Sequence, residues 1–136
     1  MRDNRDKTNV VETLCSRAFR AFRAAFEEGN TADFLALVNE EFHFSIPLPI
    51  DGWKEKQIGV HRFNELVRFE REMLQVKLTP LIELQDTHFG IVVFQAEGTL
   101  SNQPYRNELA IVFEFKHNQI MSFKEFVGMP LKKYED

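Results

Sequence analysis

The stretch from Tyr105 to Val127 reads YRNELAIVFEFK, then HN, then QIMSFKEFV, and it organises the expected fold. Two runs rich in β-branched and aromatic residues flank the polar pair His117-Asn118. This pattern predicts a β-hairpin with a tight turn. Asn118 tolerates the positive φ angle that such turns require. The two arms are therefore expected to form neighbouring antiparallel strands.

Side chains of a strand alternate between its two faces, so each arm of the hairpin divides into two sets. The more apolar set of the first arm is Tyr105, Asn107, Leu109, Ile111, Phe113 and Phe115. The more polar set is Arg106, Glu108, Ala110, Val112, Glu114 and Lys116. In the return arm, Glu125 falls between Phe123 and Val127 on a face that is expected to be buried. An acid in that position is the first candidate for a functional residue.

Length and composition favour a single domain over residues 1–136, with an ordered core from about residue 9 to residue 128. Fourteen Phe residues and a 43% hydrophobic content supply ample material for a core. The net charge of −4 argues against a nucleic-acid partner, because phosphate binding requires a basic surface. The single Cys15 excludes an internal disulfide and fits a reducing compartment. Without a signal-like start or an apolar run near the ~20 residues that span a bilayer, we expect a cytoplasmic protein that is not bound to membranes.

Three stretches carry apolar residues at helical spacing. The expected helices span residues 9–29, 31–38 and 59–74. Asn9 and Glu12 form a capping-box pattern at the start of the first helix, and Gly29 is expected to end it. One side of this helix carries Arg17, Arg20 and Arg23. We interpret these arginines as a solvated face, with nucleic-acid binding as the weaker alternative.

Period-two patterns predict strands before the hairpin as well. The expected strands span residues 41–49, 76–84 and 89–100. Pro47 and Pro49 are expected to end the first strand or confine it to an edge, and Pro80 to mark a bulge or an edge in the second. Two helices, a strand, a third helix and four antiparallel strands define an α+β fold. The expected architecture is three N-terminal helices packed on one strongly curved, mainly antiparallel sheet.

This order of elements resembles the NTF2-like, or SnoaL-like, superfamily, which includes ketosteroid isomerase-like and limonene epoxide hydrolase-like proteins. The resemblance covers residues 9 to 128, and two pieces carry it best. One is the strand-loop-Gly-helix unit of residues 42–63, and the other is the C-terminal hairpin with its Phe123-Lys124-Glu125-Phe126 segment. The resemblance implies a cone-shaped α+β barrel that encloses a pocket between the sheet and the helices. It does not select a function, because the superfamily contains both enzymes and carriers.

Two segments resemble the catalytic motifs of limonene epoxide hydrolase. The run Ser45-Ile46-Pro47-Leu48-Pro49 is similar to that enzyme's Asn-Met-Pro-Leu-Pro, which implies water-holding positions at His43 and Ser45. The family's Trp-Arg-Asp-Tyr is similar to residues 123–126, which implies a catalytic acid at Glu125. The family's Arg-x-Asp corresponds to Gln95-Ala96-Glu97. The chain departs from these motifs because Arg is replaced by Gln, Tyr by His, Asn by Ser, and both Asp residues by Glu.

The resulting catalytic candidates are Glu125, Glu97 and His43. Two carboxyl groups in one apolar pocket cannot both ionise cheaply, so they would share one proton near neutral pH. Such a set suits proton transfer next to a carbonyl, dehydration or activation of water. In the alternative, Glu97 is exposed on an edge and Glu125 pairs with Lys124 or Arg106. The substrate-binding candidates are Ser45, Gln95, Asn107, Tyr105, Trp53 and Phe123.

Two classes of function remain open: a cofactor-independent enzyme acting on a small hydrophobic molecule, and a non-catalytic binding module. An enzyme should bring at least two acidic or imidazole groups together in a closed pocket, whereas a carrier should have an almost wholly apolar one. Placement of His43 and Ser45 away from Glu125 would favour the carrier. The four histidines lack metal-ligand spacing, and no dinucleotide or phosphate-binding motif is present, so we expect neither a metal nor a cofactor.

The outer face of the sheet is expected to be apolar enough to need a partner. The residues assigned to this face are Phe94, Ala96, Ala110, Val112 and Phe126. Left bare, they would form a larger apolar patch than soluble monomers usually expose. A two-fold homodimer with the outer faces in contact is therefore expected.

Overall fold

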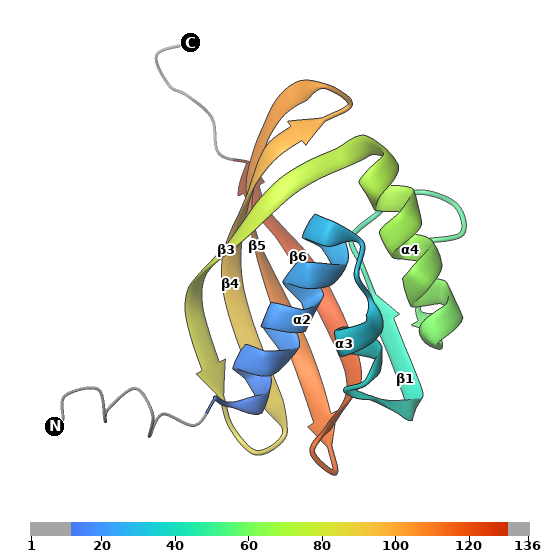
Figure 1. Cartoon of the computed structure of the whole chain (residues 1–136), viewed down its shortest axis with the longest axis vertical. Helices are drawn as coiled ribbons and strands as arrows, with labels where there is room; N and C mark the ends of the chain where they lie inside the picture. The colour runs from blue at the N-terminus through green and yellow to red at the C-terminus, as the bar shows by residue number, and fades with distance from the viewer. Residues whose placement is uncertain (1–11, 131–136) are drawn as a thin grey trace, which may run out of the picture.

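A computed structural model of the chain describes residues 12–130. The elements, in chain order, are α2 (Leu14–Glu28), α3 (Ala32–Leu35), β1 (Val38–Ser45), β2 (Gln57–Ile58), α4 (Val60–Met73), β3 (Leu74–Gln85), β4 (Phe89–Leu100), β5 (Gln103–Lys116) and β6 (Gln119–Pro130). The strands form one sheet in the order β2-β1-β6-β5-β4-β3. Figure 1 shows that the helices lie against one face of this strongly twisted sheet. We call that face the inner face and the opposite one the outer face.

The predicted α+β class and the mainly antiparallel sheet are confirmed, because only the β1–β6 pair is parallel. Two details of the prediction are wrong. The helices are not all N-terminal, since α4 follows β1 and β2 and leads directly into β3. The sheet is also open rather than closed into a barrel, because β2 and β3 form its two edges.

The hairpin of β5 and β6 is confirmed together with its turn. His117 and Asn118 have φ angles of 53° and 62°, which is the pair of positive values that a two-residue type I′ turn requires. The register pairs Phe113 with Phe123 and Ile111 with Glu125 across the two strands. This register places Glu125 on the inner face, beside the most deeply buried residues of β5.

The helix ends follow local capping chemistry. The expected start at Asn9 lies outside the described residues, and α2 begins after Thr13, whose side-chain oxygen accepts the Ser16 N–H at 3.0 Å. Gly29 ends α2 as expected, with a φ of 77° and its N–H directed at the carbonyls of Ala24 and Ala25. The second helix is shorter than predicted, because β1 begins at residue 38.

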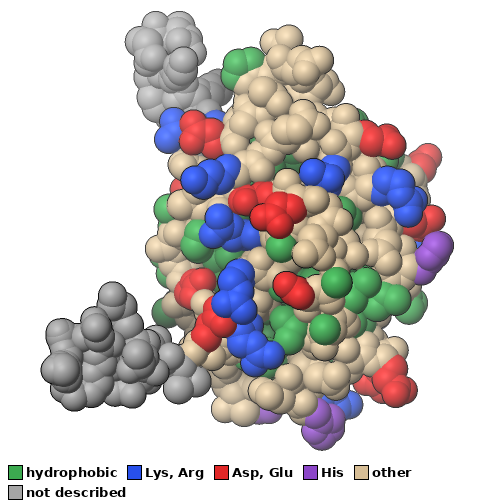
Figure 2. Space-filling view, viewed as in Figure 1, with side chains coloured by type: hydrophobic (Ala, Val, Ile, Leu, Met, Phe, Trp, Pro, Cys, Tyr) green, Lys and Arg blue, Asp and Glu red, His purple; other side chains and the backbone are tan. Residues whose placement is uncertain are grey.

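Charges of both signs alternate on the helix-bearing side of the molecule (Figure 2). Arg20 contacts Glu12 at 2.6 Å, and Arg23 contacts Glu27 at 3.4 Å. These pairs fit a solvated face better than a basic patch for nucleic acid. None of the helices described between residues 12 and 130 has both the length and the apolar character needed to span a bilayer. The cytoplasmic location stays a prediction.

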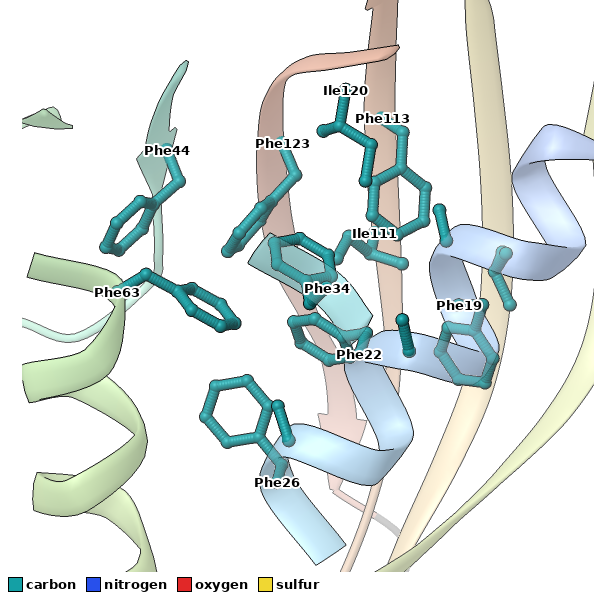
Figure 3. Packing of buried hydrophobic residues seen from close by; sticks show 14 of the residues in the cluster. Phe19, Phe22, Phe26, Phe34, Phe44, Phe63, Ile111, Phe113, Ile120 and Phe123 are labelled. Atoms are coloured by element: carbon teal, nitrogen blue, oxygen red, sulfur yellow. The ribbon is translucent and has the colours of Figure 1, made fainter. Parts of the chain in front are cut away.

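A layer of phenylalanine rings joins the helices to the inner face of the sheet. Phe34 of α3 stacks on Phe63 of α4 with 4.5 Å between ring centroids, and Phe44 of β1 stacks on Phe123 of β6 at 5.1 Å. Phe22 of α2 packs edge-on against two of these rings, those of Phe34 and Phe123 (Figure 3). The fold therefore rests on aromatic packing between elements that are far apart in sequence.

The predicted set of outer-face residues is partly wrong. Phe94 and Ala96 are 1% and 4% exposed and lie on the inner face, opposite Leu109 and Asn107 of β5. The outer face instead carries two rows of apolar residues that cross neighbouring strands. These outer apolar rows are Ile82–Val93–Ala110–Phe126 and Leu84–Ile91–Val112. Of the predicted set, Ala110, Val112 and Phe126 do belong to them.

Candidate functional site

A cavity of about 190 Å³ lies between the helices and the inner face of the sheet. It is somewhat larger than an engineered cavity of ~150 Å³ that admits benzene. Its lining is largely apolar and comes from α2, the segment after β1, α4 and strands β3 to β6. Leu100 and Val127 contribute to the lining and are 39% and 48% exposed, so the cavity opens to the surface beside them.

Two carboxyl groups face this cavity, that of Glu125 on β6 and that of Glu70 on α4. Glu125 reaches it because strand alternation puts its side chain on the same face as Phe123. Glu70 reaches it because helical spacing places residue 70 on the same side of α4 as the buried Phe63, Leu66 and Val67. Two elements that are distant in sequence therefore bring two acids to one apolar site.

Burial changes the acidity of both groups. It raises the pKa of Glu70 to about 7. Burial, and after it the negative charge of Glu70, raises the pKa of Glu125 to about 8. Within the described residues, neither carboxyl has a hydrogen bond or ion pair that favours its charged form. Burial and like charge therefore oppose ionisation of both carboxyls together near neutral pH.

The cationic residue of the cavity lining does not neutralise this pair. Arg71 also contributes to the cavity lining, but its guanidinium donates to the backbone carbonyl of Glu27 at 3.4 Å and lies against Gly29. No group of three or more His, Cys, Asp or Glu side chains in residues 12–130 is arranged to hold a metal ion. The site is therefore an apolar cavity with an uncompensated acidic pair.

A phenol donor completes the lining. Tyr105 lines the cavity, and its hydroxyl oxygen accepts a hydrogen bond of 3.1 Å from the Asn107 side-chain amide. Asn107 is 5% exposed, and its own amide oxygen accepts the Glu108 N–H at 2.9 Å. Asn107 thus fixes the phenol while leaving its proton free for a ligand. Both residues were predicted as substrate-binding, and only Tyr105 reaches the cavity.

Glu97 and Gln95 do not belong to this site. Glu97 is exposed on the outer face opposite Arg106, and Gln95 lies on the same face opposite Glu108. The prediction that Glu97 converges with Glu125 is wrong, because the register of β4 on β5 turns Ala96 inward instead. This placement agrees with the alternative in which Glu97 is solvent-exposed.

His43 and Ser45 also face away from the cavity. The buried Phe42 and Phe44 occupy the inner side of β1, so the alternating His43 and Ser45 lie on its other side. The His43 ring nitrogen Nδ1 lies 3.2 Å from the backbone carbonyl of Glu41. The expected water-holding pair is therefore not part of the described site.

Trp53 and Phe123 have packing positions. Trp53 is buried in the loop before β2, where it stacks on Phe69 with 5.9 Å between centroids and lies 3.9 Å from the Arg62 guanidinium. Phe123 belongs to the aromatic layer beneath the cavity. Neither side chain lines the cavity. Both residues were predicted to bind substrate. Both are instead core residues that pack outside the cavity lining.

Sequence reasoning missed Glu70, although a signal was present. The apolar stripe of the third helix runs through Phe63, Leu66 and Val67, and Glu70 is the next position on that stripe. This is the same anomaly, an acid at an apolar position, that identified Glu125 on its strand. Glu70 was not predicted because the second acid, Glu97, was inferred from the family resemblance and not from the helical period.

The comparisons with known proteins establish a fold. No protein family matches the sequence, and no curated protein does. Among solved structures, an NTF2-like protein of Anabaena variabilis is 21% identical with a TM-score of 0.76, over 85% of this chain and 87% of that one. A candidate polyketide cyclase of Pseudomonas putida is 19% identical with a TM-score of 0.70, over 86% and 93%.

A third structure is that of a Catenulispora acidiphila protein with a ketosteroid isomerase-like fold in complex with trimethylamine. It is 12% identical with a TM-score of 0.67, over 80% of this chain and 83% of that one. These likenesses show that the chain has the NTF2-like fold, as the order of its elements predicted.

Proposed function

We propose that this protein binds a compact hydrophobic molecule in the cavity and catalyses a cofactor-independent proton transfer on it. The observation that carries the proposal is the pair Glu70 and Glu125, two unpaired carboxyls in an apolar cavity with pKa values near neutrality. A general acid and a general base work best when their pKa values lie near the working pH. A pair that shares one proton supplies both at once.

The roles follow from this geometry. One carboxyl of the pair is the general base, and the other, which keeps its proton, is the general acid. Removal of a C–H proton beside a carbonyl leaves negative charge on the carbonyl oxygen. The protonated carboxyl of the pair and the phenol of Tyr105 are the hydrogen-bond donors that would stabilise that oxygen. This chemistry is of the isomerase or cyclase type.

Hydrolysis receives less support. In epoxide hydrolysis of the limonene type, the positions corresponding to His43 and Ser45 hold the attacking water. Both side chains lie on the far side of β1 from the inner face. The site lacks that water-holding pair, so the isomerase or cyclase type is the better proposal.

The proposal is tested by exchange of carbon-bound protons in D₂O. A panel of compact cyclic ketones and enones is incubated with the protein, and deuterium next to the carbonyl is followed by NMR. We expect Glu70→Gln and Glu125→Gln each to slow exchange by roughly 100-fold or more, because each removes one proton-transfer group. Glu97→Gln is the matched control, since its carboxyl is exposed on the outer face, and it should exchange like the wild type. Equal rates for the wild type and Glu125→Gln would refute the catalytic role.

The second candidate is a non-catalytic carrier on the same fold. The outward placement of His43 and Ser45 favours it, and so does the predominantly apolar lining. A carrier would bind members of the panel without accelerating exchange in any of them. In that case the acidic pair would serve recognition alone.

We also propose that the protein forms a two-fold homodimer through the outer apolar rows. Their exposed members, such as Ile91 and Phe126, would gain burial against a second copy. Ile91→Lys is expected to shift the protein toward monomers in light scattering at micromolar concentration, because it puts a charge into the proposed contact. The control is Ile58→Lys, which alters an exposed apolar residue on β2, at the opposite edge of the sheet. A monomeric wild type would contradict the proposal.

A further inference from the structure

We infer that the molecule bound in this cavity carries an organic cation, held between the carboxyl groups of Glu70 and Glu125. The inference rests on the proposed function, since it assigns a ligand class to the same site. The first support is charge. The titratable or charged residues of the lining are Glu70, Arg71, Tyr105 and Glu125. With the Arg71 guanidinium held at the Glu27 carbonyl, the acidic pair has no countercharge of its own.

The electrostatic attraction that a countercharge would supply to this acidic pair is large. A cation beside a carboxylate is attracted to it more strongly at the effective dielectric of a protein than in water. A neutral ligand can accept a hydrogen bond from a protonated carboxyl, but it offers no countercharge to an ionised one, whose burial is costly. An anionic ligand would add a third like charge. Of the three ligand charges, only the positive one offsets the burial of the pair.

The aromatic lining supports the same conclusion. Phe22, Phe26, Phe94 and Tyr105 all contribute side chains to the cavity. The faces of aromatic rings attract cations, and more strongly when the cation has been removed from water. A tertiary or quaternary ammonium has few N–H groups to lose from water, and its alkyl groups can pack on the apolar lining. The expected ligand is therefore a compact alkylammonium.

The size of the cavity limits the ligand. At about 190 Å³ it is of the same order as a cavity that admits benzene. This space admits a small substituted ammonium group with a short apolar body. Binding of a permanent cation should lower the pKa of both carboxyls, because a cation favours the ionised form of a carboxyl.

Choline and 3,3-dimethylbutan-1-ol provide a matched pair of probes, since they have nearly the same shape and differ in charge. Binding to the full-length protein is measured by calorimetry at pH 7.5 in two buffers with different ionisation enthalpies. We expect choline to bind roughly tenfold or more tightly than the alcohol, with release of up to one proton that the alcohol does not cause. Choline affinity should rise with pH as the pair ionises.

Substitution of the two acids tests whether choline binds in the cavity. Glu70→Gln and Glu125→Gln should each weaken choline by roughly tenfold or more and reduce the proton release. Glu97→Gln, on the outer face, should change neither quantity. Tighter binding of the alcohol, or choline binding that both Gln variants leave unchanged, would overturn the cation inference while the proposed catalysis could still show itself in the ketone panel. Absence of binding by either probe, together with absence of ketone exchange, would refute the proposed function as well.

Discussion

Raising the pH from 5 to 9 should lower the free energy of unfolding by roughly 3 kcal/mol or more, because Glu70 and Glu125 must ionise in an apolar cavity. Both folded-state pKa values, about 7 and about 8, lie above the ordinary value of 4.5. The folded state therefore holds protons that the unfolded chain has already released. The stability that these protons provide is fully present below pH 4.5 and is lost as the pH rises through 7 and 8.

Substitution by glutamine should remove much of this dependence. At pH 5 the wild type and Glu125→Gln should unfold at similar denaturant concentrations, since both side chains are then neutral. At pH 9 the variant should be the more stable of the two by roughly 2 kcal/mol, because it has no charge to bury. Urea unfolding at pH 5, 7 and 9 measures the difference, with the exposed Glu97→Gln as control. Parallel pH profiles for the wild type and Glu125→Gln would contradict the buried-pair assignment.

Asp86 should change the free energy of unfolding over a lower pH range than the cavity acids do, and in the opposite direction. Hydrogen bonds from the backbone N–H groups of Phe89 and His88 lower the pKa of its carboxyl below the usual 3.8. A lowered folded-state pKa adds stability above the unfolded value and loses it as the pH falls further. Loss of stability at low pH is therefore expected from groups like Asp86. Loss of stability at high pH is expected from Glu70 and Glu125.

The hairpin could be predicted from sequence because its pattern is local and unambiguous. Phe113, Glu114, Phe115 and Lys116 alternate between apolar and polar side chains just before the turn, and Asn118 supports the turn. Strand β4 offers no such pattern, since Ile91, Val92, Val93 and Phe94 form a continuous apolar run. A shift of one residue exchanges the two faces of a strand. Only pairing with β5 decides which of these residues point inward, and this register is absent from the sequence of β4 alone.

The candidate site was half predictable for a related reason. Glu125 stood out because its own strand has a clear inner face. Glu70 carried the same signal on α4, but nothing in the sequence says that this helix lies over β6 at residue 125. The residues taken from the resemblance, Glu97 and His43, failed because a motif match does not fix which side of a strand a residue occupies. An unpaired buried acid costs stability, and such local conflicts are expected where a protein keeps a functional group.

Phe123→Ala should lower the free energy of unfolding by roughly 3–5 kcal/mol, the range for removing a large aromatic side chain from a core. Phe123 is 2% exposed, and six other phenylalanine rings lie within 6.4 Å of it, centroid to centroid. Those rings come from α2, α3, α4, β1 and β5, so the ring of Phe123 contacts nearly every layer of the fold. Its loss removes these contacts and leaves a void that the surrounding elements can fill only partly.

Two further variants separate this packing effect from a general effect of changing a phenylalanine. Phe89→Ala alters a ring that is exposed at the start of β4 and should cost less than about 1 kcal/mol. Phe123→Leu keeps most of the apolar volume and should cost clearly less than Phe123→Ala. Urea unfolding at pH 5 is the appropriate measurement, because the cavity acids are then neutral and do not add to the difference. Equal losses for Phe89→Ala and Phe123→Ala would mean that the aromatic layer does not hold β6 against the helices, and the position of Glu125 beside Glu70 would then need another cause.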